Sequence, residues 1–314
     1  YERTGNLNGQ ALCHNAIANA CFSMGRWGEA NQHYYHAREI FEQVGDVYNQ
    51  AIADNNLGGS ALKQGRLDEA LVFYQEALQS LEQIGGSLYL QGVLHMNLGW
   101  TFVRRGETDA ARQQLHIGQD YFEQIQARDF LPELHRHFAE AALLDGELAE
   151  AKAQAEQALR LTHELAQRDE EGICRRVLGE IAIAQGQFGE AIAYLSEASA
   201  ILEKVGDEYE FARSQLSLAR LYVSWAKSWD EQALTADEGP VLSEVEGPVL
   251  NKAEGPVLSE VEGLAALERC IPVFQQLDAA MDLAAAHALQ DVARAIVPAA
   301  PVREAANDEL DSNP

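Results

Sequence analysis

Five glycines recur along the chain at a nearly constant spacing. They are Gly25, Gly65, Gly106, Gly146 and Gly186, separated by 40, 41, 40 and 40 residues, and the sixth expected place holds Ala226. Self-similarity at a fixed period of about 20 to 50 residues is typical of stacked supersecondary units. The spacing therefore predicts an elongated array rather than two ordinary globular domains.

A small residue stands seven positions before each of these six places. The residues are Ala18, Gly58, Gly99, Ala139, Gly179 and Ala219, and alanine also recurs five positions after the glycines, as Ala30, Ala70, Ala111, Ala151 and Ala191. Because small side chains let two helix axes approach to about 8 to 10 Å, both places predict helix contacts. Each glycine is expected to end a first helix in the left-handed conformation.

The segment after each glycine carries apolar residues at three- and four-residue spacing. In residues 65–85 these are Tyr74, Ala77, Leu81 and Ile84. This spacing predicts an amphipathic second helix whose apolar face needs a neighbour to cover it. First helices are expected to begin where a side chain can accept a hydrogen bond from the first turn, at Asp46, Ser87, Asp169, Asp207 and Asp278.

These positions together form a known signature. Leu57-Gly58, Ala61, Gly65, Ala70, Tyr74 and Ala77 resemble the tetratricopeptide repeat, and Leu98-Gly99, Phe102, Gly106 and Ala111 repeat the pattern, over about residues 8–226 in all. The usual first-helix Trp is replaced by Asp54 or His95, and the period of about 40 exceeds the family's 34. The long period resembles the subgroup of spindle-orientation adaptors, kinesin light chains and bacterial signalling ATPases of the maltose-regulator type, which implies protein binding and regulation.

The repeat pattern breaks after the first helix of a sixth repeat. Three near-identical octamers follow, with Pro240, Pro248 and Pro256 eight residues apart. Because proline lacks the backbone donor that helices and sheets use, we predict a disordered acidic insertion over residues 229–263. A flexible acidic docking strand is the alternative.

The segments on either side of the insertion complete the domain organisation. Residues 1–228 are predicted to hold five repeats and the first helix of the sixth. Residues 264–298 would supply its second helix, with Leu267, Cys270, Phe274 and Leu277 on the apolar side, and then a capping helix. Residues 299–314 are predicted to be a disordered tail.

Charge and cysteine content narrow the possible partners and compartment. The chain has 23 Lys and Arg against 49 Asp and Glu, a formal charge of -26, which disfavours nucleic acid and anionic membrane as partners. Cys13, Cys21, Cys174 and Cys270 form no C-x-x-C pair and are expected to be small core residues of a cytoplasmic protein. No signal peptide or long apolar run is visible, and the start at Tyr1 suggests a piece of a longer protein.

No phosphate-binding, dinucleotide-binding, nucleophile-elbow or metalloprotease motif occurs, so we predict no enzyme activity, cofactor or metal. The nearest approach to a metal site is Glu133, His137 and Glu140, which share a helix face. We interpret these three as exposed neighbours, and His33 and His36 as a solvated pair. A metal-dependent enzyme is the least favoured alternative.

The resemblance implies that first helices line a concave groove and that positions three before and one after each small residue point into it. These and adjacent inward positions select Asn15, Asn19, Asn55, Asn56, Met96, Asn97, Trp100, Arg104, Arg136, Arg176, Arg213 and Arg220, together with Gly59, Glu140, Glu180 and Leu216. Asparagine amides can bind a peptide backbone, and arginines can bind carboxylates. We therefore predict a protein or peptide partner with an acidic stretch and an apolar residue that contacts Trp100.

Two interpretations compete with this groove. Arg136 and Glu140, like Arg176 and Glu180, are four residues apart and can pair with each other on their own helices. Trp100 can equally pack between helices as a core residue. If both hold, the groove at these residues acts as a spacer surface, and a partner can bind elsewhere on the molecule.

The sequence thus predicts an all-α, right-handed solenoid of about six tetratricopeptide-like helix hairpins. Its leading predicted function is a protein-interaction module of bacterial type. The alternative is the C-terminal regulatory or sensor arm of a larger signalling ATPase, cyclase or transcription regulator.

Overall fold

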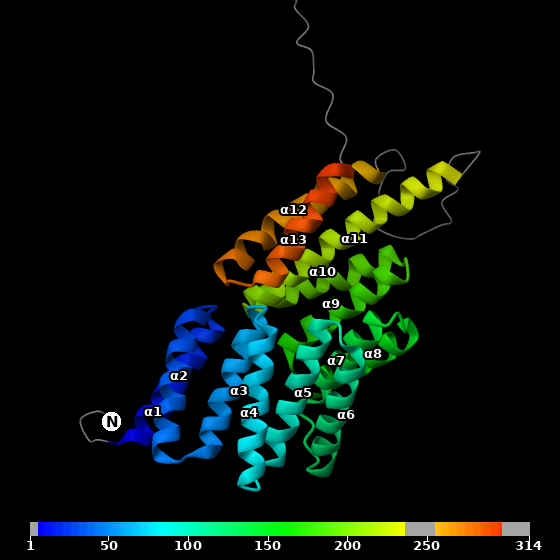
Figure 1. Ribbon diagram of the computed structural model, residues 1–314. Coiled ribbons are helices and arrows are strands. Elements are labelled where there is room, and N and C mark those ends of the chain that lie inside the picture. The colour runs from blue at the N-terminus through cyan, green and yellow to red at the C-terminus, as the bar shows by residue number, and fades with distance from the viewer. Residues whose placement is uncertain (1–5, 236–254, 297–314) are drawn as a thin grey trace, which may run out of the picture.

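The computed structural model describes residues 6–235 and 255–296, and within these ranges every regular element is an α-helix. Figure 1 shows the helices stacked side by side in a curved array. The fold is an all-helical solenoid of tetratricopeptide-like hairpins, as predicted. The helices are α1 (Leu7–Ser23), α2 (Trp27–Val44), α3 (Val47–Lys63), α4 (Leu67–Gln83), α5 (Leu88–Arg105), α6 (Thr108–Gln124), α7 (Leu131–Leu144), α8 (Leu148–Leu165), α9 (Arg168–Ala184), α10 (Phe188–Val205), α11 (Glu208–Thr235), α12 (Gly255–Gln276) and α13 (Ala280–Ile296).

Each odd-numbered helix from α1 to α11 packs antiparallel against the helix that follows it, and each hairpin then packs on the next. The odd-numbered helices also contact one another directly, α3 with α5, α5 with α7, α7 with α9 and α9 with α11. They therefore form the inner layer of the curve, and the even-numbered helices form the outer layer. None of the described helices combines the length and apolar character needed to cross a bilayer.

The helix ends follow the predicted chemistry at most positions. All five repeat glycines have positive φ, between 71° and 81°, at the ends of first helices. Asp46, Ser87 and Asp207 accept hydrogen bonds from first-turn backbone N–H groups, as predicted. The prediction is wrong for two residues. Asp169 lies inside the first turn of α9, which begins at Arg168, and Asp278 adopts a left-handed conformation (φ 54°) between α12 and α13.

The small residues before the glycines mark close helix approaches. A Cβ atom added to Gly58 would lie 2.5 Å from the Tyr74 ring, and one added to Gly99 or Gly179 would lie 2.6 Å from Leu115 or Leu195. Contacts under 3.0 Å are too short for carbon atoms, so a larger residue at any of these three places would force the facing side chain to move. The alanines five positions after the glycines are completely buried.

The apolar sides of the second helices form the core between hairpins. Tyr74, Ala77 and Leu81 are buried, but Ile84 is 50% exposed because α4 ends at Gln83. The predicted side chains of the last hairpin, from Leu267 to Leu277, are buried in one cluster. Among the cysteines, Cys21, Cys174 and Cys270 are core residues, whereas Cys13 is exposed on α1.

The predicted insertion is partly helical. At Ala226 no glycine ends the helix, and α11 continues to Thr235. At the other side α12 begins at Gly255, so Pro256 occupies the first turn, where the missing backbone donor costs no hydrogen bond. Residues 229–235 and 255–263 are therefore helical rather than disordered. The remaining insertion, residues 236–254, and the predicted tail from 297 on lie outside the described residues.

The curve brings the last hairpin back to the first two, in what we call the closing contact. The turn between α12 and α13 faces the α1–α2 and α3–α4 turns, so that a Cβ added to Gly25 would lie 2.5 Å from Leu277. Trp27 packs edge-on against Tyr209 of α11, with ring centroids 5.4 Å apart. The Lys63 ammonium lies 5.0 Å from the centre of the same tyrosine ring. The array therefore contacts itself from end to end.

Candidate functional site on the inner face

An amide row crosses the N-terminal part of the inner face. It consists of Asn15 and Asn19 on α1, Asn55 and Asn56 on α3, and Asn97 on α5. The Asn56 Nδ2 group donates toward Oδ1 of Asn15 (3.3 Å) and of Asn19 (3.4 Å), and Asn97 Nδ2 donates to Asn55 Oδ1 (2.8 Å). These bonds join successive repeats and align the amides across three helices.

Each amide of the row keeps hydrogen-bonding capacity. Within the described residues, Oδ1 of Asn56 and of Asn97 accepts no hydrogen bond, and Nδ2 of Asn55 donates none. All three side chains are half-buried. A side-chain amide offers two donors and one acceptor oxygen, so the row presents both kinds of group to an extended backbone.

The predicted apolar residues that follow the row lie in the core. Met96 is 1% exposed and packs with Leu115 and Phe122. Trp100 is 8% exposed, and its ring stacks on His137 with centroids 5.0 Å apart. The interpretation of Trp100 as a core residue is therefore the one this structure shows.

Arg136 of α7 is the first of two buried arginines in an inner ion-pair network. Its side chain is 4% exposed. Its guanidinium contacts Glu140 at 3.2 Å, Glu133 at 3.5 Å and Glu170 of α9. One arginine thus forms ion pairs with three carboxylates.

Arg176 of α9 is the second, and its side chain is completely buried. It contacts Glu180 at 3.0 Å, Glu140 at 3.3 Å and Glu210 of α11 at 3.5 Å. The pairing of each arginine with the glutamate four residues later is therefore present, and contacts between helices extend it. The network links α7, α9 and α11 along the inner face.

The network separates the pKa values of its carboxylates. Burial alone would raise the pKa of Glu140, but Arg136, His137 and Arg176 outweigh it and hold this pKa well below its ordinary value. Burial raises the pKa of Glu170 to about 7. The nearby Arg136 acts to lower this pKa, but the effect of burial is larger, and Arg136 also contacts Glu133 and Glu140. Glu140 is thus ionised at neutral pH, whereas Glu170 titrates there.

His137 belongs to this buried region, so the prediction that it is an exposed neighbour is wrong. It has no exposed surface, with Nδ1 at 3.1 Å from Glu140 and Nε2 at 3.5 Å from Glu133. The reason is that this face of α7 turns toward the inner layer, where both carboxylates also contact Arg136. Among the described residues, no group of three or more His, Cys, Asp or Glu is arranged to hold a metal ion.

The two histidines on α2 that were predicted to be a solvated pair, His33 and His36, differ in their exposure. The His36 side chain is 61% exposed. His33 is half-buried, with Nδ1 2.8 Å from Nδ1 of His14 on α1.

Arg104 and Arg213 belong to a cluster around Tyr209. Arg104, at the end of α5, lies 3.0 Å from Asp282 of α13 and donates to the Tyr209 hydroxyl at 3.1 Å. That hydroxyl donates to Asp282 at 2.8 Å, and burial raises its pKa to about 12. Arg213 lies 3.4 Å from Glu210 and 3.9 Å from Asp282. The cluster lies beside the closing contact.

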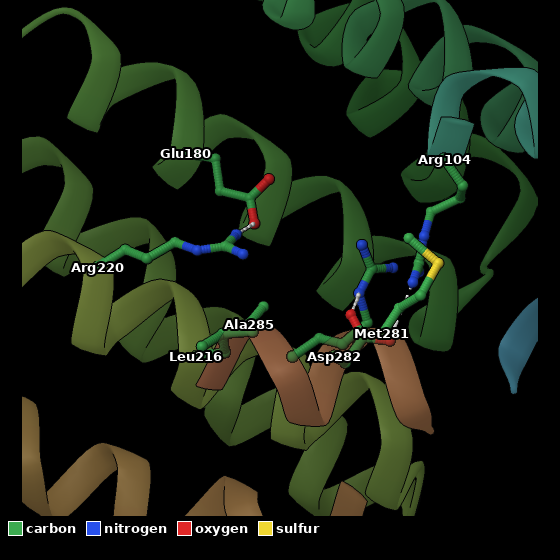
Figure 2. Close-up of a pocket in the computed structure, with 8 residues that line it drawn as sticks. Arg104, Glu180, Leu216, Arg220, Met281, Asp282 and Ala285 are labelled. Atoms are coloured by element: carbon green, nitrogen blue, oxygen red, sulfur yellow. Dashed lines mark hydrogen bonds and ion pairs between the residues drawn. The ribbon is translucent and has the colours of Figure 1, made fainter. Parts of the chain in front are cut away.

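A cavity of about 180 Å³ opens next to this cluster (Figure 2). Arg104, Glu180, Arg213, Leu216, Arg220, Met281, Asp282 and Ala285 line it. The Arg220 side chain reaches toward Glu180, at 4.0 Å, and is 47% exposed. Three of the predicted arginines, Arg104, Arg213 and Arg220, therefore meet at one place.

Sequence reasoning missed the partners that α13 and the α11 N-terminus supply, namely Asp282, Met281, Tyr209 and Glu210. Tyr209 and Asp282 lie far along the chain from Arg104, at separations of 105 and 178 residues. A buried arginine predicts a carboxylate somewhere nearby, but the repeat spacing does not identify which one.

Comparison with known proteins agrees with this architecture. Residues 49–115 match the sequence model described as tetratricopeptide repeat, so the chain contains repeats of that kind. Comparison with curated protein sequences finds no match.

Solved structures resemble the chain in fold at low sequence identity. A Rap protein complexed with Competence and Sporulation Factor aligns with a TM-score of 0.58 and 12% identity, over 91% of this chain and 76% of that one. The apo form of RapI aligns with a TM-score of 0.56 and 10% identity, over 91% and 97%.

A signal transduction ATPase with a tetratricopeptide repeat sensor, from Pyrococcus horikoshii, aligns with a TM-score of 0.54 and 14% identity. The alignment covers 91% of this chain and 38% of that one. Tetratricopeptide repeat domains are typically protein-interaction modules, and at these identities the likeness concerns the fold. The chain is a solenoid of tetratricopeptide-like repeats similar to these proteins.

Proposed function

We propose that this protein binds an extended segment of a partner protein or peptide along the amide row on its inner face. The carrying observation is the alignment of five asparagines across α1, α3 and α5, with donors and acceptors left unused. An extended backbone alternates N–H and C=O groups, and paired amides can meet both. The solved complex of the Rap protein with Competence and Sporulation Factor supports ligand binding by this kind of fold.

The inner ion-pair network changes the predicted character of the partner. Arg136 and Arg176 are buried and already contact three carboxylates each. Their charges are balanced inside the protein, so a long acidic stretch has no reason to bind there. The proposed ligand therefore has an ordinary backbone bound by asparagines rather than an acidic run bound by arginines.

Peptide-library binding tests the proposal. The wild type is compared with Asn56→Ala and Asn97→Ala, and with Gln113→Ala, which removes an exposed amide on the outer helix α6. We expect the two asparagine variants to weaken binding of the selected peptides about tenfold and the glutamine variant to leave it unchanged. Equal binding by all four proteins would reject the amide row as the site.

A regulatory arm of a larger signalling protein is the second candidate. It is favoured by the alignment with an ATPase that has a repeat sensor, in which the matched part is 38% of that chain. The reading frame that encodes this chain tests it. A nucleotide-binding domain in the same frame supports the arm, and a frame without any second domain contradicts it.

A further inference from the structure

The cavity between α5, α9, α11 and α13 is lined by both apolar and charged residues. Leu216 and Ala285 contribute apolar surface, together with the Met281 side chain (Figure 2). Arginines and carboxylates form the rest of the lining. At about 30 Å³ for a liquid water, the volume of about 180 Å³ admits several non-hydrogen atoms of a ligand.

The charged groups of the cavity are not equally satisfied. Asp282 already binds Arg104 at 3.0 Å and the Tyr209 hydroxyl at 2.8 Å. Glu180 accepts from Arg176 at 3.0 Å and also from Ser217. Both carboxylates of the lining therefore have closer partners than Arg220.

Among the described residues that line the cavity, Arg220 is the arginine with unused donors. Its nearest carboxylate oxygen, on Glu180, is 4.0 Å away, beyond hydrogen-bond distance. Within the described residues its guanidinium makes no hydrogen bond. A guanidinium presents its donors as a planar fork that matches a carboxylate in a bidentate arrangement. The geometry thus offers a single carboxylate site at the edge of an apolar surface.

The charges of the lining residues indicate which charge a ligand would carry. Three arginines face two carboxylates, so the residues around the cavity carry one net positive charge. A singly charged carboxylate balances that charge, whereas a phosphate dianion would bring an excess negative charge close to Glu180 and Asp282. The apolar surface beside Arg220 suits a side chain attached next to the carboxylate.

We propose that this cavity binds the free C-terminal carboxylate of the bound segment through Arg220, with the last side chain of that segment on Leu216, Met281 and Ala285. This inference rests on the proposed function, because the amide row would hold the same segment. The amide row comes nearest to the cavity along α5, where Asn97 and the cavity-lining Arg104 lie seven residues apart, or about 10 Å along the helix. An extended ligand covers this distance with three or four residues.

The test uses two copies of a peptide library attached through the N-terminus, one with free C-terminal carboxylates and one amidated. We expect the wild type to select free peptides with an apolar last residue and to bind their amidated forms at least tenfold more weakly. Arg220→Gln should weaken the free peptides about tenfold and leave the amidated forms unaffected. Arg160→Gln is the matched control, because Arg160 is exposed on the outer helix α8 and donates to Gln157.

The outcomes separate this inference from the proposed function. If amidation and Arg220→Gln have no effect while Asn56→Ala still weakens binding, the carboxylate site is rejected and the amide row stands. If amidated peptides bind fully but lose binding when an internal Asp or Glu is changed to its amide, an acidic side chain occupies the site and the C-terminal assignment is overturned. If Asn56→Ala has no effect either, the proposed function itself fails.

Discussion

The amide row and the inner ion-pair network lie on the same concave layer but treat their polar groups in opposite ways. The asparagines of the row are half-buried or, at Asn19, exposed, and they keep unused donors and acceptors. The two arginines of the network are almost completely buried, and its glutamates, which are 4% to 28% exposed, are paired with them. The difference teaches that inward position alone does not make a residue available to a partner. A position on the inner layer can be used for binding or for holding neighbouring repeats together.

Removal of one network arginine should give the largest effect. In Arg176→Ala, the carboxylates Glu140, Glu180 and Glu210 lose a shared cation while they stay buried. We expect a loss of about 3 to 5 kcal/mol in the free energy of unfolding, measured by urea denaturation. Arg160→Ala, at an exposed outer site, should change it by about 0.5 kcal/mol or less. A similar small change for Arg176→Ala would erase the distinction between the two regions.

A substitution in the N-terminal repeats tests close packing there. Gly58→Ala would place a Cβ atom 2.5 Å from the ring of buried Tyr74, and we expect it to destabilise the fold by about 1 to 3 kcal/mol. Gly59→Ala is the matched control on the same helix, since its Cβ would meet nothing closer than 3.8 Å. Because alanine favours a helix, that variant should be more stable by up to about 1 kcal/mol. Thermal unfolding of both variants would show opposite shifts.

The titration of Glu170 should make the stability of the ion-pair network depend on pH. Its folded-state pKa of about 7 lies above the ordinary 4.5, so its favourable contribution is fully present below about pH 4.5 and is lost as pH rises through 7. A neutral glutamine avoids that loss. We therefore expect the stability of Glu170→Gln relative to the wild type to improve by roughly 1 to 3 kcal/mol between pH 5 and pH 8.

Another glutamate of α9 gives the control for this measurement. Burial acts to raise the pKa of Glu180, but Arg176, Arg220 and Arg213 lower it overall, so this carboxylate is ionised throughout that pH range. The effect of Glu180→Gln should be nearly constant between pH 5 and pH 8. Parallel pH profiles for the two variants would contradict the assignment of Glu170.

The smallest expected effect on stability comes from the amide row. Asn56→Ala removes two long hydrogen bonds, at 3.3 and 3.4 Å, from a half-buried site, and we expect a loss below about 1 kcal/mol. Denaturation beside the peptide-binding assay would show a variant that binds poorly but folds well. A loss as large as that of Arg176→Ala would assign the row a structural role instead.

The local part of the fold was predictable because it depends on spacing. Glycine at the end of a first helix and a small residue seven positions earlier are enough to locate each hairpin, and the absence of glycine at Ala226 coincides with the extended α11. The asparagines of the row were also found, since successive repeats repeat their inward positions. These features depend only on contacts within one repeat and with its neighbour, so the sequence pattern is enough to predict them.

The rest depends on contacts between distant repeats. Arg136 and Arg176 were predicted to face a partner because the repeat pattern cannot show that Glu170 and Glu210 approach from the next helices. The position of Asp282 beside Arg104 depends on the total rotation accumulated over all repeats. Small differences in each hairpin angle add up along the array, and the sequence pattern does not specify them.

The closing contact changes how such an array is expected to unfold. An open stack, in which each unit touches its two neighbours, can lose its terminal units first while the middle survives. Here Trp27 near one end packs on Tyr209 near the other, so fraying of the first hairpin also uncovers the last. We expect the chain to unfold in one cooperative transition rather than repeat by repeat.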